Sequence, residues 1–342
     1  MRGFLAAYEQ DSGKEVWRRW TIPAKGEPGA ETWDGEDILH GGGPTWLTGS
    51  YDPETKTVYW TTGNAGPDFN GDNRKGDNLY TCSILAIDVN TGQLKWHFQT
   101  TPHDEWDWDA VQPVLLLDAD WQGQPRKLLV QANRNGFLYI LDRATGKLLL
   151  AKPLVKKLTW AKEIQADGRP LMNPNQNPTV EGNLICPSVV GGANFFSTSF
   201  NPATGLFYVN TMEACSVISK RASGNWTAGQ GYVGGGGRRV PDEKVRKVLR
   251  AFDIKTGKVA WELEESGDGS SWSGTLTTAG GLVFFGDDAG ALSVADAATG
   301  KLLGSYPFTD IPHSSPMTYV FDNKQYVAMT NGTQVYAFGL PD

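Results

Sequence analysis

The stretch 103–109, His-Asp-Glu-Trp-Asp-Trp-Asp, brings acidic and aromatic side chains close together along the chain. In an extended strand, side chains alternate between faces, so Glu105, Asp107 and Asp109 would share one face and the two tryptophans the other. Carboxylates this close stay ionised together only if a cation or hydrogen-bond donors offset their repulsion. The stretch therefore indicates either a cation site with a carboxylate base or a solvated acidic turn between strands.

The rest of the chain must position this stretch, and its composition favours many short strands. The 342 residues include 41 glycines and 13 tryptophans, and such a sequence is typical of strands joined by turns. A repeat-built all-β fold can use this length as one unit. The net charge of −7 argues against a nucleic acid partner and would help to dock a basic protein.

The N-terminus and the cysteines bear on where the protein works. No apolar run approaches the roughly 20 residues needed to cross a bilayer, and no signal peptide stands at the start. Residues 1–8 look like a strand already under way, so we expect a further N-terminal segment. The three cysteines are too far apart for a Cys-x-x-Cys or haem-attachment motif, and their odd number leaves one thiol free unless a partner is missing.

A strand–turn–strand pattern recurs five times along the chain. Each turn has the form Asp-x-x-Thr-Gly or a close variant, and its glycine supplies the positive φ that such hairpins need. In three copies the second strand carries a tryptophan, and we expect Trp17, Trp96 and Trp261 to join adjacent units of the fold. The copies occupy residues 5–17, 85–96, 139–147, 250–261 and 293–303.

Further apolar strands between these copies predict four strands per unit, which is the pattern of a β-propeller. The separation of 43 residues between Gly257 and Gly300 matches the length of one four-stranded blade. Two polar, glycine- or proline-rich insertions, 156–187 and 220–246, are expected to be long loops. Complete units are predicted at 40–100, 109–154, 194–264 and 270–308, and partial units at 2–20 and 313–340.

The tryptophan-ending repeat resembles the docking motif of the alcohol dehydrogenases that depend on pyrroloquinoline quinone (PQQ), which are eight-bladed quinoprotein propellers. More specific segments occur in the family's order: Gly-Gly-Gly-Pro-Thr-Trp at 41–46, Tyr-Asp-Pro at 51–53, Thr-Gly-Asn at 62–64, Gly-Asp-Asn-Leu at 76–79, the acidic run at 103–109 and Arg-Asn-Gly at 134–136. The resemblance implies that residues 1–342 form one partial propeller domain, incomplete relative to the eight-bladed ring, with about four complete blades and two partial ones. The resemblance also implies that the chain corresponds to the C-terminal part of the family's fold.

The resemblance also assigns a metal site. Asp107 matches the catalytic aspartate, which would take the hydroxyl proton of an alcohol while hydride leaves its carbon. Asn64 matches a ligand that binds a hard cation through its amide oxygen. Asp109 matches an acid that lanthanide-dependent relatives carry and calcium-type ones lack, and a trivalent ion gains more from it. We expect Asn64, Asp107 and Asp109 to bind a lanthanide ion, with Ca²⁺ as the alternative; without the resemblance, each fits a surface acid or a turn residue.

Three further residues match contacts to PQQ. Trp46 matches the tryptophan that stacks under the ring system, and the glycines before it would let the backbone approach the ligand closely. Arg134 matches the basic residue near the reactive quinone oxygens. Asn194 lies near another hydrogen-bond donor of the family, although Phe195 stands where the family often has tryptophan. Without the resemblance, Trp46 fits a core tryptophan and Arg134 fits a surface ion pair.

The resemblance implies a periplasmic enzyme that oxidises primary alcohols to aldehydes by hydride transfer to PQQ and passes electrons to a cytochrome c. Its signal peptide is expected on the missing N-terminal part. No Cys-x-x-Cys-His occurs in the chain, so the haem would belong to a partner. Two alternatives to an enzyme are left open: a non-catalytic scaffold propeller with PQQ-like repeats, and a fragment that binds nothing. A homodimer is also left open.

Overall fold

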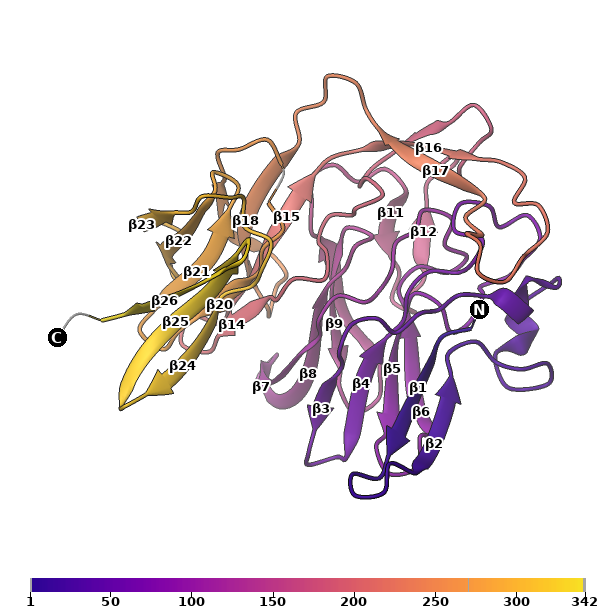
Figure 1. Cartoon of the computed structure of the whole chain (residues 1–342), viewed down its shortest axis with the longest axis horizontal. Helices are drawn as coiled ribbons and strands as arrows, with labels where there is room; N and C mark the ends of the chain where they lie inside the picture. Colours follow the sequence, from indigo (N-terminus) through magenta and orange to yellow (C-terminus); the bar gives the residue numbers. More distant parts are fainter. Residues whose placement is uncertain (1, 270, 341–342) are drawn as a thin grey trace. The chain divides into compact units, whose positions relative to one another are not determined.

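The computed structural model describes residues 2–269 and 271–340, and these contain 26 β-strands and two short 3₁₀ helices (Figure 1). The 3₁₀ helices are η1 (Ala30–Thr32) and η2 (Asp37–His40). The predicted all-β class is therefore confirmed. Across the described ranges, no helix has the length and apolar character to cross a membrane.

The chain divides into two compact units, each described here by itself. The first holds the described residues up to Asn194 together with Cys215–Asp242, and the second holds Phe195–Ala214 and the described residues from Glu243 onward. The candidate residues 46, 64, 107, 109, 134 and 194 all lie in the first unit.

Antiparallel sheets in the first unit match the predicted units of the repeat. A two-stranded sheet pairs β1 (Phe4–Tyr8) with β2 (Glu15–Trp20). One four-stranded sheet has the order β3 (Ser50–Asp52), β4 (Thr57–Thr61), β5 (Ser83–Asp88), β6 (Leu94–Gln99). The other has the order β10 (Leu148–Pro153), β9 (Phe137–Asp142), β8 (Gln124–Ala132), β7 (Leu115–Trp121).

The second unit repeats the same plan. Its first sheet has the order β14 (Ser199–Asn201), β15 (Leu206–Glu213), β18 (Arg246–Asp253), β19 (Val259–Glu264). The next has the order β20 (Thr275–Thr277), β21 (Leu282–Asp287), β22 (Ala291–Asp296), β23 (Leu302–Pro307). A three-stranded sheet follows, with the order β24 (Met317–Phe321), β25 (Lys324–Asn331), β26 (Gln334–Gly339). Four-stranded antiparallel sheets in chain order are the blades that the repeat predicts.

The repeated turn is built as its sequence predicts. In the β5–β6 turn, the carboxylate of Asp88 accepts hydrogen bonds from the backbone N–H and the hydroxyl of Thr91, at 3.1 and 3.2 Å. Gly92 follows with φ of 71°, a left-handed conformation that costs glycine little. The same side-chain bonds recur between Asp142 and Thr145. The motif therefore fixes the hairpin register in successive blades.

The glycine of the turn also receives a tryptophan from the preceding sheet. Trp17 donates from Nε1 to the carbonyl of Val89 at 2.9 Å, and a Cβ on Gly92 would lie 2.7 Å from its ring. Trp96 packs on Gly146 in the same way, with 2.5 Å to such a Cβ. Trp261 likewise packs on Gly300. The three tryptophans join adjacent sheets within each unit, as expected.

The two insertions are more regular than the loops that their composition predicts. The first contains a hairpin of β11 (Ala161–Ile164) and β12 (Pro170–Met172). β13 (Asn183–Ile185), β16 (Ser216–Lys220) and β17 (Gly235–Arg239) form a three-stranded sheet, and Cys186 is disulfide-bonded to Cys215 beside it. The loop prediction was wrong here because strand pairing uses backbone groups, which a glycine-rich edge strand still provides.

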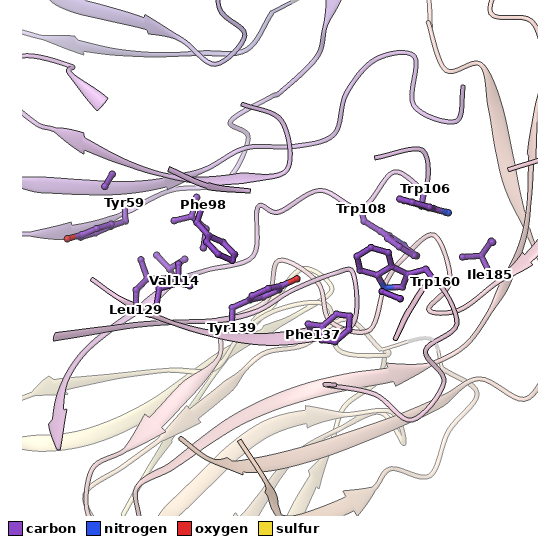
Figure 2. Packing of buried hydrophobic residues seen from close by; sticks show 14 of the residues in the cluster. Tyr59, Phe98, Trp106, Trp108, Val114, Leu129, Phe137, Tyr139, Trp160 and Ile185 are labelled. Atoms are coloured by element: carbon purple, nitrogen blue, oxygen red, sulfur yellow. The ribbon is translucent and has the colours of Figure 1, made fainter. Parts of the chain in front are cut away.

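The core of the first unit contains stacked tryptophans at one end of its apolar cluster (Figure 2). Trp106 and Trp108 stack with ring centroids 5.0 Å apart and planes 18° from parallel. Trp160 contacts Trp108 edge-on at 5.4 Å, and Phe137 packs against Trp160 in turn. Large buried aromatic rings contribute strongly to stability, so this cluster firmly anchors the stretch 103–109.

Candidate cofactor and metal site

The stretch 103–109 is not a strand, so the predicted alternation of faces was wrong. It is irregular, and Asp107 has φ of 61°, a left-handed conformation that costs a non-glycine residue about 1–3 kcal/mol. Glu105 does not join the other acids, because it accepts hydrogen bonds from the N–H of Gly71 at 2.7 Å and the amide of Asn177 at 2.8 Å. The irregular backbone of the stretch places Trp106 and Trp108 in the core and turns Asp107 and Asp109 away from Glu105.

Arg74 connects the stretch 103–109 to the segment that follows Asn64 through hydrogen bonds to both. Its side chain is fully buried and donates from Nη2 to the carbonyls of Asp104, at 2.6 Å, and Pro67, at 3.0 Å. Nη1 donates to the amide oxygen of Asn78 at 2.7 Å. Burial raises the pKa of Asp104 to about 7, against the opposite effect of Arg74. The sequence did not single out Arg74, because its partners are mostly backbone carbonyls distant in sequence.

Asp107 and Asp109 converge on the guanidinium of Arg134. Arg134 donates from Nη1 to Oδ2 of Asp109 at 2.8 Å and from Nη2 to Oδ2 of Asp107 at 3.3 Å. Its Nε donates to the carbonyl of Val189 at 2.9 Å, which holds the plane of the group. The arginine thus binds two acids at once and orients both.

The acids lie in a poorly hydrated place, which changes their protonation. Burial raises the pKa of Asp107 to about 8, and the nearby Arg134 acts in the opposite direction. Burial likewise raises the pKa of Asp109, again opposed by Arg134. Ionisable groups with a strongly shifted pKa, in a cleft or in the interior, are characteristic of functional sites. An added cation would favour the charged form of both carboxylates.

Asn64 joins the same group through its backbone and its side chain. Its N–H donates to Oδ1 of Asp109 at 2.8 Å, and a Cβ on Gly63 would lie 2.1 Å from that oxygen, so only glycine fits there. Its side-chain NH₂ donates to Asp68 Oδ1 at 2.8 Å and to the carbonyl of Ala65 at 3.2 Å. The structure therefore brings Asn64, Asp107 and Asp109 together, and their role as ligands of one cation stays a prediction.

Asp68 is a fourth member of this group that the sequence did not reveal. Burial raises its pKa to about 6, and the charge of Asp109 acts in the same direction. Its only sequence signal is its position four residues after Asn64, and an acid in a polar loop is too common to stand out.

The donor set of the chain suits a hard cation. Asn64, Asp107 and Asp109 offer one amide and two carboxylate groups, which are the ligand types that Ca²⁺ and similar ions prefer. In the two described ranges, no group of three or more His, Cys, Asp and Glu side chains is arranged to hold a metal ion. Such ions take about six to eight oxygens, so the chain offers part of a coordination sphere.

Trp46 lies at the border of this group and is 48% exposed. Its side chain acts on Asp109 by lowering the pKa of that carboxyl group, against the larger effect of burial. The glycines before it pack on the backbone of Asn64: Gly43 donates to the carbonyl of Asn64 at 2.8 Å, and a Cβ on Gly42 would lie 2.7 Å from that oxygen. A close approach of these glycines to PQQ stays a prediction. An exposed planar ring beside the acids fits the predicted platform for PQQ.

Asn194 is held at the end of the first unit. Its amide donates to the carbonyl of Val190 at 2.8 Å. Gly192 donates to the carbonyl of Arg134 at 3.0 Å, and a Cβ on Gly191 would lie 2.2 Å from Cγ of Arg134. The segment that carries Asn194 therefore packs on Arg134, and a contact of Asn194 with PQQ stays a prediction.

Comparison with known proteins agrees with this fold. The family described as "Glucose/ethanol/alcohol dehydrogenase, beta-propeller domain" matches residues 1–153, and the one described as "Outer membrane protein assembly factor BamB" matches residues 219–341. Quinohemoprotein alcohol dehydrogenase ADH IIB of Pseudomonas putida is 39% identical over 97% of this chain and 50% of its own length. A lanthanide-dependent methanol dehydrogenase of Methylacidiphilum fumariolicum is 36% identical over 97% of this chain and 58% of its own length.

The structural comparison points the same way. A europium-containing methanol dehydrogenase superposes with a TM-score of 0.88 and 36% identity, covering 96% of this chain and 61% of that one. The tryptophan-docked blades and these relatives define the chain as part of a quinoprotein β-propeller. The chain belongs to the family of PQQ-dependent alcohol and methanol dehydrogenases. It spans about half to three-fifths of the length of these relatives.

Proposed function

We propose that the protein containing this chain oxidises primary alcohols to aldehydes and uses PQQ as the hydride acceptor. The observation that carries this proposal is the convergence of Asp107 and Asp109 on Arg134, with Asn64 bound to Asp109. A scaffold propeller needs the docking tryptophans but has no use for two carboxylates grouped around one buried arginine. Residues 219–341 match the family of an assembly factor. This match concerns the repeat, and it does not include the two acids or Arg134.

Asp107 is the proton acceptor in this proposal. A proton acceptor must be ionised, and a cation bound beside Asp107 would favour the charged form of its carboxylate. Arg134 holds the carboxylate in one orientation, so a hydroxyl bound beside Oδ2 would meet a preset acceptor. PQQ, when bound, supplies the quinone carbon that receives hydride. Trp46 would stack on its ring system, and Arg134 would balance charge that develops on its oxygens.

Asn64, Asp107 and Asp109 would hold a cation, which we propose to be a lanthanide. Two carboxylates attract a trivalent ion more strongly than Ca²⁺, because the attraction scales with the product of the charges. A relative named as lanthanide-dependent and a similar structure named as europium-containing support this choice. Ca²⁺ remains the alternative ion.

We place the protein in the periplasm, with a cytochrome c as its electron acceptor. The net charge of −7 favours encounter with a basic carrier, and the chain has no Cys-x-x-Cys-His for a haem of its own. The preferred alcohol depends on loops of the complete propeller. A homodimer is compatible with this proposal.

The direct experiment adds PQQ and La³⁺ to metal-free protein and measures alcohol-dependent reduction of a dye. Asp107→Asn should remove turnover and leave the fold intact, since asparagine has nearly the same shape. Asp167→Asn, in the exposed turn between β11 and β12, is the matched control and should keep full activity. Turnover by Asp107→Asn at the unmodified rate would contradict the role of Asp107. Absence of PQQ binding by the complete protein would favour the scaffold.

A further inference from the structure

Asp68 occupies a specific place beside the proposed cation site. Its Oδ1 accepts a hydrogen bond from the side-chain NH₂ of Asn64 at 2.8 Å. Asn64 is only 9% exposed, so its amide has few other partners to choose from. The contact therefore bears directly on how Asn64 presents its side chain.

The two ends of an asparagine amide have opposite roles toward a cation. The oxygen can be a ligand, whereas the NH₂ group can only donate hydrogen bonds and would repel the ion. An ionised carboxylate is only an acceptor, so Asp68 selects the NH₂ end of Asn64 and rejects the oxygen end. The carbonyl of Ala65, at 3.2 Å from the same nitrogen, makes the same selection. Together they favour a single orientation of the amide.

The backbone on both sides of Asp68 is fixed, so the carboxylate is held in position. The carbonyl of Pro67 accepts from buried Arg74 at 3.0 Å. The N–H of Phe69 donates to the carbonyl of Val233 at 2.9 Å, and the Phe69 ring is buried. A carboxylate between two such anchors has little freedom to leave Asn64.

We propose that Asp68 is a positioning residue that keeps the amide oxygen of Asn64 available to the cation. This inference rests on the proposed cation site. Residues that orient metal ligands through a hydrogen bond typically change metal affinity by about 10–100-fold when they are removed. Asp68 acts through Asn64 and need not touch the ion itself.

Terbium binding tests the proposal without turnover. Tb³⁺ luminescence, sensitised by tryptophan, gives the affinity of the metal-free protein. Asp68→Ala should weaken Tb³⁺ binding by about tenfold or more. Asp68→Asn should weaken it less, because an asparagine oxygen can still accept from Asn64. Asp72→Asn is the matched control: this acid lies on the same loop, is exposed and binds Lys220, so the affinity should stay within about twofold.

A double-mutant cycle separates positioning from simple loss of charge. In an Asn64→Ala background, Asp68→Ala should have almost no further effect on Tb³⁺ binding. An equal loss of affinity in both backgrounds would overturn the proposal, because Asp68 would then act by its charge alone. Retention of the wild-type circular dichroism and melting temperature shows that each variant is folded.

A metal-free measurement distinguishes failure of this inference from failure of the cation site. In protein labelled with ¹⁵N-asparagine, Asp68→Ala should shift the side-chain NH₂ signals of Asn64 strongly, and Asp72→Asn should leave them unchanged. Unshifted Asn64 signals in Asp68→Ala would overturn the positioning contact. Wild-type protein that binds no Tb³⁺, with those signals shifted as expected, would instead overturn the cation site and the role of Asp68 in it.

Discussion

Asp109 accepts the backbone N–H of Asn64 through Oδ1 at 2.8 Å and the guanidinium of Arg134 through Oδ2 at 2.8 Å. Each oxygen of this carboxylate therefore has a defined partner before any ion is bound. The contact with Asn64 links two segments that are 45 residues apart in the chain. Asp109 is thus both a candidate ligand and part of the structure that holds Asn64.

This double role predicts two effects of Asp109→Ala. Lanthanide-dependent turnover should fall by at least about tenfold, because the site loses a carboxylate. The variant should also lose about 1–3 kcal/mol of stability, because the N–H of Asn64 is left unpaired in a buried place. Metal titration and urea unfolding measure the two effects. Asp109→Asn, which keeps an acceptor oxygen, should separate them by losing lanthanide preference with a smaller loss of stability.

Equal turnover of the wild-type protein with La³⁺ and Ca²⁺ would contradict the lanthanide assignment. An Asp109→Ala variant indifferent to lanthanides would do the same. Either outcome would leave Asp109 with its structural contacts alone.

Arg134→Lys should lower kcat much more than it weakens PQQ binding. A lysine cannot hold both Asp107 and Asp109 in the planar geometry of a guanidinium, so the orientation of the base is lost. Loss of one such preorganised group typically costs about a hundredfold in kcat. Arg126→Lys is the control, since this arginine is exposed and contacts Asp142 at 3.4 Å. Steady-state kinetics that show an unchanged kcat for Arg134→Lys would rule out the proposed role.

Trp46 should contribute mainly to holding the cofactor. Trp46→Ala removes an aromatic ring that is half exposed, so the fold should tolerate it while PQQ binds about tenfold or more weakly. Trp46→Phe keeps a planar ring and should recover much of the affinity. Equilibrium titration with PQQ measures this, and equal affinity of all three proteins would remove Trp46 from the site.

The repeat made the blades predictable, because each copy carries its own turn and docking residues. Asp88, Thr91 and Gly92 form a local motif whose partners are a few residues apart, so the sequence contains the whole interaction. The strand β17 was missed because a glycine-rich segment has no alternation of apolar side chains, although its backbone pairs with β16.

The candidate site was predictable only where family motifs mark it. The structure brings Asp107, Asp109 and Arg134 together, although the sequence did not predict that Arg134 pairs with both acids. The strand geometry assumed for the acids was wrong, because Asp107 adopts a left-handed turn. Arg74 and Asp68 were missed because their contacts depend on how distant segments pack. Their roles follow from tertiary structure and leave no pattern in the sequence.

The docking of Trp96 on Gly146 predicts a strong effect of a single methyl group. Gly146→Ala should destabilise the first unit by more than about 2 kcal/mol, because it combines a left-handed φ of 73° with a Cβ 2.5 Å from the indole. Gly123→Ala is the matched control: its φ is 79°, but a Cβ there meets nothing within 4 Å. Urea unfolding should show a clearly larger loss for Gly146→Ala. Equal losses would mean that the docking contact contributes little.

Glu265 provides a prediction about pH in the second unit. Burial raises its pKa to about 8, while the N–H of Asp288 and the charge of Lys247 act in the opposite direction, and Asp287 and Asp288 add to the increase. Its Oε2 accepts from the N–H of Asp288 at 2.7 Å, and its buried Oε1 has no hydrogen-bond partner. The ionised form is therefore poorly accommodated in the folded protein.

A carboxyl group with a higher pKa in the folded state binds more protons there than in the unfolded chain. Its contribution to stability is fully present below the unfolded value of about 4.5 and is lost as the pH rises through about 8. Glu265→Gln mimics the protonated form, so it should melt about 2–4 °C above the wild type at pH 8.5 and close to it at pH 5. Glu264→Gln, on an exposed side chain that pairs with Arg246, is the matched control and should show no such pH dependence. Thermal unfolding between pH 5 and 9 measures the difference, and parallel curves for wild type and Glu265→Gln would show that Glu265 does not titrate in this range.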